Sequence, residues 1–182
     1  REVMVPACAL VMDLQTIVAR RIAPVDTAVV SVTELVTDGT RNALPGLARI
    51  LGDARSFRPE VSATIETEMR RLAEGIALQY GIEARLRYDR EFVPTINDAE
   101  LAEAMMQAAG PVSDVTATRA EPMTGSEDFA RFLSRVPGCF AFIGNGEGSA
   151  PLHAPNYDFN DAALLHGAQV HAAIARARLP EG

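Results

Sequence analysis

The sequence predicts a mixed α+β fold, and three patterns of side chains support this prediction. Apolar residues recur at helical spacing in residues 5–22 and 59–81, which predicts two amphipathic helices. Residues 27–36 are rich in β-branched side chains and residues 47–57 follow them across a turn, which predicts a hairpin of two strands. Residues 83–90 alternate apolar and charged side chains, the period of a strand with one wet face. The predicted order is therefore helix, strand, strand, helix, strand.

One further strand ahead of residue 1 would complete the pattern βαββαβ. This is the ferredoxin-like unit, in which both helices cover one face of an antiparallel sheet. We therefore expect residues 1–92 to form such a unit without its first strand, and the natural start of the protein to lie upstream. Pro59 takes the first position of the second predicted helix, which ends near Gly81. Gly52 interrupts the second strand, where a β-bulge or a close backbone approach is expected.

The pattern changes after residue 92, and we place a domain boundary there. Residues 93–182 combine short helical stretches with loops. The predicted elements are a helix capped by Asn97 that ends at Gly110, a helix capped by Ser126 that ends at Leu133, a short buried strand at 139–143, and a helix at 161–178.

Composition narrows the class of protein. The chain has 182 residues, of which 48% are hydrophobic, so it can bury a core of its own. Its formal net charge of −7 argues against a nucleic-acid partner, because phosphate binding needs a basic face. Its apolar runs are far shorter than the roughly 20 residues that cross a bilayer, so we expect a cytoplasmic protein without membrane contact. Cys8 and Cys139 lie far apart in apolar settings, and we expect two buried free thiols.

His153 is the strongest candidate for chemistry on residue type alone. It follows a predicted strand and a glycine-rich loop, where an imidazole can face a cleft as a metal ligand or a base. The alternative is a structural histidine held by hydrogen bonds, because a single imidazole makes neither a metal site nor a catalytic dyad. His166 and His171 lie on one predicted helix and point roughly 140° away from each other, so they cannot share a metal.

The segment MTGSEDF is a second candidate. It exposes the backbone at Gly125 and places Glu127 in the first turn of a predicted helix. Free N–H groups there would suit a substrate carboxylate, but helix capping alone also explains the segment.

Asn42 and Arg55 form a third candidate pair. Asn42 lies in the predicted turn between the two strands, and Arg55 lies on the second strand. An arginine fork and an amide donor can hold a carboxylate end group. A turn former and an ordinary sheet cation are the simpler interpretation of the two residues.

Several segments occur together in one order: LQTIVAR, AVVSV, RNALP, ILGDARSF, MTGSEDF, PGCFAFIGNG and PLHAPNYDFND. This ordered set resembles the hippurate hydrolase and indole-acetyl-amino-acid hydrolase branch of the aminoacylase and carboxypeptidase family of metallopeptidases. The resemblance implies an α/β zinc-peptidase catalytic domain with two divalent metal ions, zinc or manganese-like, and a ferredoxin-like lid that forms a homodimer. Residues 1–92 would be the lid, and residues 93–182 the C-terminal part of the catalytic domain. The segment NALP stands where NVIP is commoner in this family. The resemblance therefore does not define which substrate side chain the protein prefers.

The same resemblance implies roles for the candidate residues. His153 would be a metal ligand, Asn42 and Arg55 would line the site of the substrate carboxylate, and the loop with Gly125 and Glu127 would close the pocket. The implied reaction is hydrolysis of the amide bond of an N-acyl amino acid or peptide by a metal-activated water, with a glutamate as base. The resemblance places the other metal ligands upstream, so this chain would supply at most one ligand and be inactive alone. A non-catalytic dimerisation or interaction module is the alternative.

Overall fold

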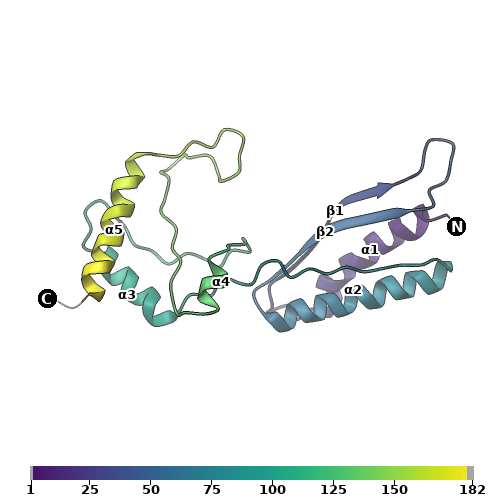
Figure 1. The fold of residues 1–182 in the computed structure, drawn as a ribbon, viewed down its shortest axis with the longest axis horizontal. Coiled ribbons are helices and arrows are strands. Elements are labelled where there is room, and N and C mark those ends of the chain that lie inside the picture. The colour runs from purple at the N-terminus through teal and green to yellow at the C-terminus, as the bar shows by residue number, and fades with distance from the viewer. Residues whose placement is uncertain (1, 180–182) are drawn as a thin grey trace. The chain divides into compact units, whose positions relative to one another are not determined.

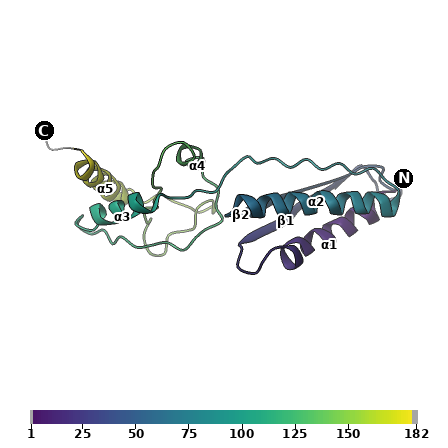
Figure 2. The same cartoon turned by 90° about the horizontal axis from the view of Figure 1, so that it is seen from below.

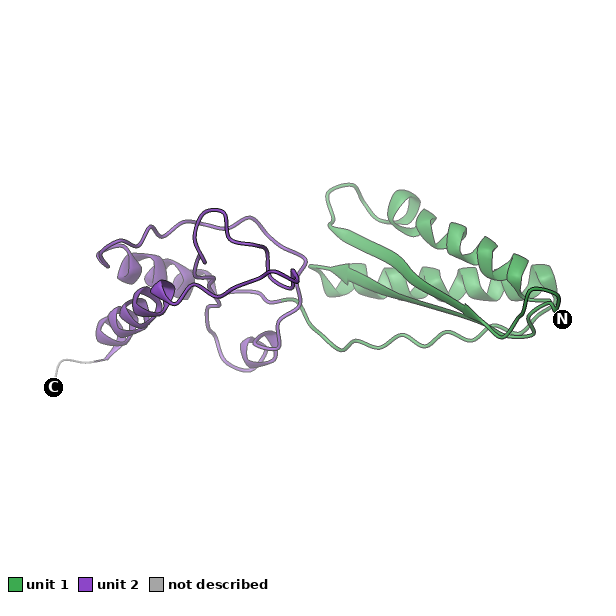
Figure 3. Cartoon of the chain, turned by 90° about the horizontal axis from the view of Figure 1, so that it is seen from above, with its two compact units in different colours: residues 1–94 green, residues 95–182 purple. Residues whose placement is uncertain are grey.

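The chain divides into two compact units (Figure 3), and the computed structural model describes residues 2–179 of it. Unit 1 is Arg1–Pro94 and unit 2 is Thr95–Gly182. The division falls two residues beyond the boundary expected after residue 92. Each unit has its own packed elements.

Unit 1 consists of two helices and an antiparallel hairpin within its described residues (Figure 1). Pro59 takes the first helical position of the second helix, where its missing N–H costs no hydrogen bond. Gly81 ends that helix in the left-handed conformation, with φ 61°. Both helix ends were predicted from the sequence and are confirmed. The elements are α1 (Met4–Arg21), β1 (Ala28–Thr37), β2 (Ala48–Ser56) and α2 (Pro59–Tyr80).

The core of unit 1 lies between its two helices and one face of the hairpin (Figure 1). Ile17 of α1 and Ile65 of α2 are fully buried, and they cluster with Val30 of β1 and with Val61. Ala54, the pairing partner of Val30 on β2, packs against the same cluster. Burying one isoleucine side chain contributes about 1.5–3 kcal/mol. The helices and the hairpin therefore form two layers that bury each other's apolar surface.

The hairpin carries a β-bulge opposite Gly52. The pairing shifts by one residue between Val32 and Glu34, so Thr33 is the extra residue of β1. A Cβ atom at Gly52 would lie 2.2 Å from the carbonyl oxygen of Ser31. The close backbone approach predicted at this glycine is confirmed, because any side chain there would collide with β1.

The strand predicted at residues 83–90 is not formed, so this prediction was wrong. The segment is extended (Figure 1), but within the described chain its residues 83–89 make no backbone–backbone hydrogen bond. A strand needs a neighbouring strand to receive its N–H and C=O groups. Alternating side chains are present here without that neighbour.

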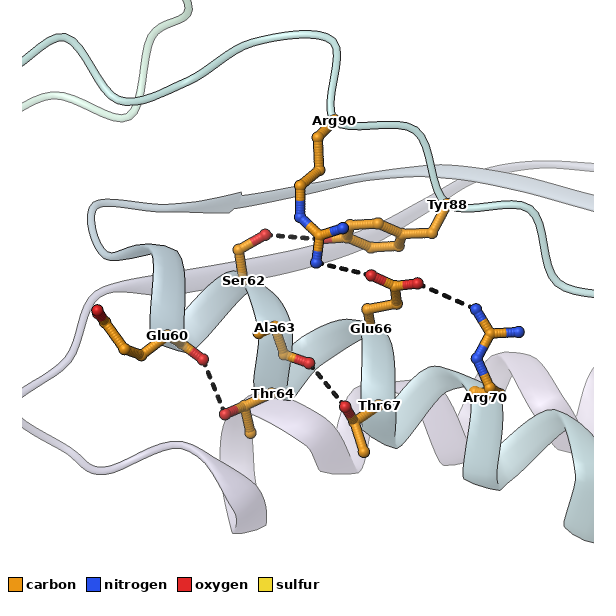
Figure 4. Close-up of polar contacts among 9 residues, drawn as sticks. All are labelled: Glu60, Ser62, Ala63, Thr64, Glu66, Thr67, Arg70, Tyr88 and Arg90. Carbon is orange, nitrogen blue, oxygen red and sulfur yellow. Dashed lines mark hydrogen bonds and ion pairs between the residues drawn. The ribbon is translucent and has the colours of Figure 1, made fainter. Parts of the chain in front are cut away.

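Side chains hold the same segment on α2 (Figure 4). The hydroxyl oxygens of Tyr88 and Ser62 are 3.3 Å apart, and Arg90 approaches one carboxylate oxygen of Glu66 at 2.6 Å. Arg70, four residues further along the helix, approaches the other oxygen at 3.0 Å. The hydrogen bond from Arg70 and the nearby Arg90 lower the pKa of Glu66 against a smaller opposing effect of burial.

Unit 2 contains helices but no strand in its described residues. The first and last helices of the unit pack against each other (Figure 2). Ala109 of the first helix and Gly167 of the last are buried. No helix in residues 2–179 is long and apolar enough to cross a membrane. The elements are α3 (Ala99–Ala109), α4 (Ala130–Leu133) and α5 (Ala162–Arg178).

The sequence predicted that Asn97 caps α3, and this prediction was wrong. Its side-chain N–H₂ donates to the carbonyl oxygen of Phe140, and its side-chain oxygen accepts from the Phe140 N–H, both at 2.8 Å. The cap is the next residue, Asp98, whose carboxylate accepts from the N–H of Leu101 at 3.0 Å. The strand predicted at residues 139–143 is also absent, so that prediction was wrong. The side chain of Asn97, rather than a partner strand, binds the backbone of Phe140 there.

The two thiols differ in exposure. Cys8 is exposed on α1, so the expectation of a buried thiol was wrong there. The buried face of α1 includes Ala7 and Ile17, and consecutive helical residues point about 100° apart, which turns Cys8 outward. Cys139 is half-buried, with its sulfur 3.8 Å from that of Met105, and burial raises its pKa.

Candidate active site

His153 occupies the third position of a tight turn in unit 2. The N–H of Ala154 donates to the carbonyl oxygen of Pro151 at 3.1 Å, which closes the turn. His153 itself has φ 69°, in the left-handed region that few residues other than glycine adopt. Such a conformation costs of order 1–3 kcal/mol, and residues that adopt it cluster at functional sites. The imidazole is exposed.

Two asparagines close the base of the loop that carries His153. The side-chain N–H₂ of Asn145 donates to the carbonyl oxygen of Asp158 at 2.8 Å, and its side-chain oxygen accepts from the N–H of Asn160 at 2.7 Å. Asn160 returns a side-chain hydrogen bond to the carbonyl oxygen of Asn145 at 3.3 Å. Sequence reasoning missed both residues. The Gly-Asn-Gly context of Asn145 was the available signal, because asparagine in loops bonds nearby backbone.

The segment with Gly125 and Glu127 is a loop rather than the start of a helix. α4 begins only at Ala130, has four residues and is capped by no side chain, so the predicted cap at Ser126 was wrong. Glu127 is half-buried, whereas Gly125 is exposed, with open space where a Cβ would lie. A helix this short offers no anion site at its N-terminus. Any role of the segment therefore belongs to the loop itself.

Asn42 lies at the tip of the β1–β2 hairpin. Thr40 and Ala43 exchange two backbone hydrogen bonds of 3.1 Å, which leaves Arg41 and Asn42 as the two turn residues between them. The hydroxyl of Thr40 donates to the side-chain oxygen of Asn42 at 3.3 Å. The side chain is exposed, and its N–H₂ group is a hydrogen-bond donor.

Arg55 lies near the other end of the hairpin. It pairs with Val29, and its guanidinium Nε is 2.5 Å from a carboxylate oxygen of Asp53. Strand residues advance by about 3.3 Å, so Arg55 is roughly 23 Å from Ala48, where β2 leaves the hairpin loop. Unit 1 therefore does not bring Asn42 and Arg55 together.

The residues present do not form a metal centre by themselves. Within residues 2–179, no three His, Cys, Asp or Glu side chains come together as metal ligands. On α5, Nδ1 of His166 lies 3.1 Å from the carbonyl oxygen of Ala162, which occupies that nitrogen. His153 thus remains a single candidate ligand, and no chemical step can be assigned to a metal on this chain alone.

Proteins to which the chain is similar are named as deacetylases, carboxypeptidases and an amidohydrolase. Residues 11–177 match the model of peptidase family M20/M25/M40. The chain belongs to this family.

Three relatives illustrate the match. The chain is 32% identical over 167 residues to N-acetylcysteine deacetylase of Bacillus subtilis (strain 168), covering 91% of this chain and 43% of that protein. It is 31% identical over 164 residues to thermostable carboxypeptidase 2 of Saccharolobus solfataricus, covering 87% and 41%. The crystal structure of the YXEP protein of Bacillus subtilis, a dinuclear metal binding peptidase from the M20 family, matches with TM-score 0.79 and 28% identity over 97% of this chain and 46% of that one. The chain spans less than half the length of these relatives.

Proposed function

We propose that this chain is part of a metal-dependent amidohydrolase that releases an amino acid from an N-acyl amino acid, with hippurate-like conjugates as candidate substrates. The family match over residues 11–177 is the observation that carries the proposal. N-acetylcysteine deacetylase and N-acetyldiaminopimelate deacetylase are named for N-acyl amino acids, which supports this substrate class. Carboxypeptidase relatives make a peptide the alternative substrate. We place the enzyme in the cytoplasm.

The two units correspond in this proposal to two functional parts. Residues 1–92 form the lid, of which α1, β1, β2 and α2 supply the two-layer portion. Residues 93–182 form the C-terminal part of the catalytic domain and carry the His153 loop. Two divalent ions, zinc or manganese-like, belong to the complete enzyme, and the dinuclear metal binding of the YXEP protein supports that number. His153 contributes one ligand, and the other ligands come from polypeptide outside residues 1–182.

Asn42 and Arg55 support a homodimer in this scheme. They lie at opposite ends of the hairpin, so one substrate carboxylate can meet both only if they come from two copies of the chain. Arg55 would supply the charged fork and Asn42 an amide donor. Gly125 and Glu127 belong to the loop that closes over the same substrate.

The first experiment tests the metal ligand. A longer version of the protein, with its upstream polypeptide, should bind two metal ions and hydrolyse hippurate or N-acetylcysteine, while the 182-residue chain should do neither. In the longer protein, His153→Ala should lower kcat/KM by at least about 100-fold and reduce bound metal, because a ligand matters at least as much as the groups that orient it. His171→Ala, exposed on α5, is the matched control.

Three outcomes would contradict the proposal. Turnover by the 182-residue chain alone would show that it contains a complete site. Full metal content in the His153→Ala protein would remove this residue from the ligand set. Absence of both metal and turnover in the longer protein would favour the interaction module, which the lack of a metal cluster in residues 2–179 also permits.

Mixed dimers test the shared carboxylate site. Asn42→Ala and Arg55→Ala should each raise KM strongly when present in both copies. Random mixing of the two variants should restore about a quarter of the wild-type activity, because half of the dimers are mixed and each mixed dimer has one intact site. If mixing restores nothing, the two residues act within one copy or not at all.

A further inference from the structure

Both ends of the loop formed by residues 145–160 are attached to α5. Just ahead of the loop, Ile143 lies against this helix, because a Cβ atom at the buried Gly167 would be 2.9 Å from its Cδ1 atom. At the other end, the side-chain oxygen of Asn160 accepts from the N–H of Ala162, the first residue of α5, at 3.1 Å. A surface loop whose two ends are held together in this way has the form of an Ω-loop.

The side chains of Asn145 and Asn160 join the two ends of the loop directly, and we call this pair the asparagine clasp. The two residues exchange hydrogen bonds at 2.7 and 3.3 Å. The N–H₂ group of Asn145 also donates to the hydroxyl oxygen of Ser149 at 2.6 Å and to the carbonyl oxygen of Asp158 at 2.8 Å. Both N–H bonds of this amide are therefore used inside the loop.

Two consecutive turns connect the asparagine clasp to His153. The N–H of Tyr157 donates to the carbonyl oxygen of Ala154 at 2.9 Å, which closes a turn directly before Asp158, where the clasp holds the chain. Ala154 also closes the turn that contains His153, so the two turns share this residue. Pro155 lies inside the first turn and fixes its own φ angle. No residue without a constraint separates the clasp from the histidine turn.

The conformation of His153 needs such a constraint. Its φ of 69° lies in the left-handed region, where a residue other than glycine persists only when its surroundings hold it there. The side chain is exposed, so packing around the imidazole does not supply this constraint. The hydrogen bonds of the neighbouring turns and of the clasp are what can supply it.

We propose that Asn145 and Asn160 are positioning residues for His153, and that the asparagine clasp keeps the backbone of His153 in one conformation before any ligand binds. A loop that is already ordered loses less conformational entropy when its ligand arrives. The consequence for a metal ion rests on the proposed function, in which His153 is a ligand. The positioning of His153 itself does not rest on it.

NMR relaxation of ¹⁵N in the 182-residue chain tests this role without metal or substrate. In the wild type, the order parameters S² of His153 and Ala154 should be near about 0.85, the value of a rigid backbone. Asn145→Ala should lower them below about 0.6 and move the ¹³C shifts of His153 toward those of an unstructured chain. Asn156→Ala should change neither quantity, because Asn156 is exposed in the same loop but outside the clasp.

Substitutions at Asn160 provide a second pair of variants. Asn160→Ala should loosen His153, because it removes the acceptor of the Ala162 N–H and the donor to Asn145. Asn160→Asp keeps that acceptor at the start of α5 and should retain order parameters close to those of the wild type. The amides of α5 report in every variant whether unit 2 remains folded.

Unchanged order parameters at His153 in both Asn145→Ala and Asn160→Ala would overturn the proposal. Equal loosening by Asn156→Ala would do the same, since the effect would then not come from the clasp. Loss of order throughout α5 in both alanine variants would mean that the asparagines stabilise unit 2 as a whole, which also contradicts a positioning role. A loosened loop, together with full metal content in the longer His153→Ala protein, would support the clasp and contradict only the proposed function.

Discussion

Space around single glycines decides which side chains unit 1 tolerates. A Cβ at Gly52 would lie 2.2 Å from the carbonyl oxygen of Ser31, whereas a Cβ at Gly75, inside α2, would meet nothing within 4 Å. We expect Gly52→Ala to lower the free energy of unfolding by about 1–3 kcal/mol, as overpacking does. Gly75→Ala should raise it by about 0.5–1 kcal/mol, because alanine favours the helix. Urea denaturation followed by circular dichroism measures both, and effects of the same sign would disprove the predicted contact.

Glu66 gives unit 1 a dependence on pH. The hydrogen bond from Arg70 and the nearby Arg90 lower its pKa in the folded state from the ordinary value of 4.5. The ionised carboxylate therefore stabilises the fold above the unfolded pKa, and this stability is lost as the pH falls through the lowered folded value. Glu66→Gln should be less stable than the wild type at pH 7, and the difference should vanish in acid.

The control for this prediction is Glu74→Gln, because Glu74 is exposed on the same helix. Urea midpoints at pH 7 and at about pH 3 provide the comparison. A difference between Glu66→Gln and the wild type that persists unchanged in acid would mean that packing, rather than charge, makes Glu66 important.

Sequence reasoning at the residue scale succeeded where a local rule decides the outcome. The close approach at Gly52 follows from a glycine inside a strand pattern. The exposure of Cys8 was predicted wrongly, since the phase of a helix face depends on what packs against it. The Gly-Asn-Gly context marks Asn145 as a loop residue, but its partner Asn160 lies 15 residues further along the chain, so the sequence does not indicate the hydrogen bond between them. The proposed roles of the candidate site residues rest on the resemblance and stay predictions.

Secondary-structure elements were predicted correctly where their backbone hydrogen bonds have partners within the described chain. Helices α1 and α2 form hydrogen bonds within themselves and strands β1 and β2 pair with each other, and the sequence located all four to within a few residues. Residues 83–90 and 139–143 have the side chains of strands but no partner strand in the described chain. A side-chain pattern indicates which face of a strand is buried, but the strand exists only where another strand receives its hydrogen bonds.

The cap of α3 is a prediction at the same scale. The Asp98 carboxylate accepts from the N–H of Leu101 at 3.0 Å, so Asp98→Ala should cost about 1 kcal/mol of the stability of unit 2. Ser126→Ala should change stability by less than about 0.5 kcal/mol, because Ser126 caps no helix. Denaturation monitored by the amide hydrogen exchange of α3 distinguishes the two variants. A larger loss of stability in Ser126→Ala would mean that Ser126 does cap a helix, as the sequence predicted.

The two units differ in the cores that stabilise them. In unit 1, the fully buried side chains of Ile17 and Ile65 join Val30 and Val61 in one cluster. The buried hydrophobic residues described in unit 2 are alanines, while Phe132 remains 67% exposed. A buried methylene contributes about 0.8 kcal/mol, so an alanine core supplies much less than an isoleucine core.

Unit 2 should therefore open before unit 1 when the 182-residue chain is placed in urea. Native-state hydrogen exchange should show the amides of α5 losing protection at a lower urea concentration than those of α2. In the longer protein the urea concentrations at which α5 and α2 lose protection should differ less, because additional polypeptide can cover the aromatic side chains that unit 2 exposes. Simultaneous loss of protection in the 182-residue chain would contradict this, since it would require the two units to unfold as one cooperative body despite their unequal cores.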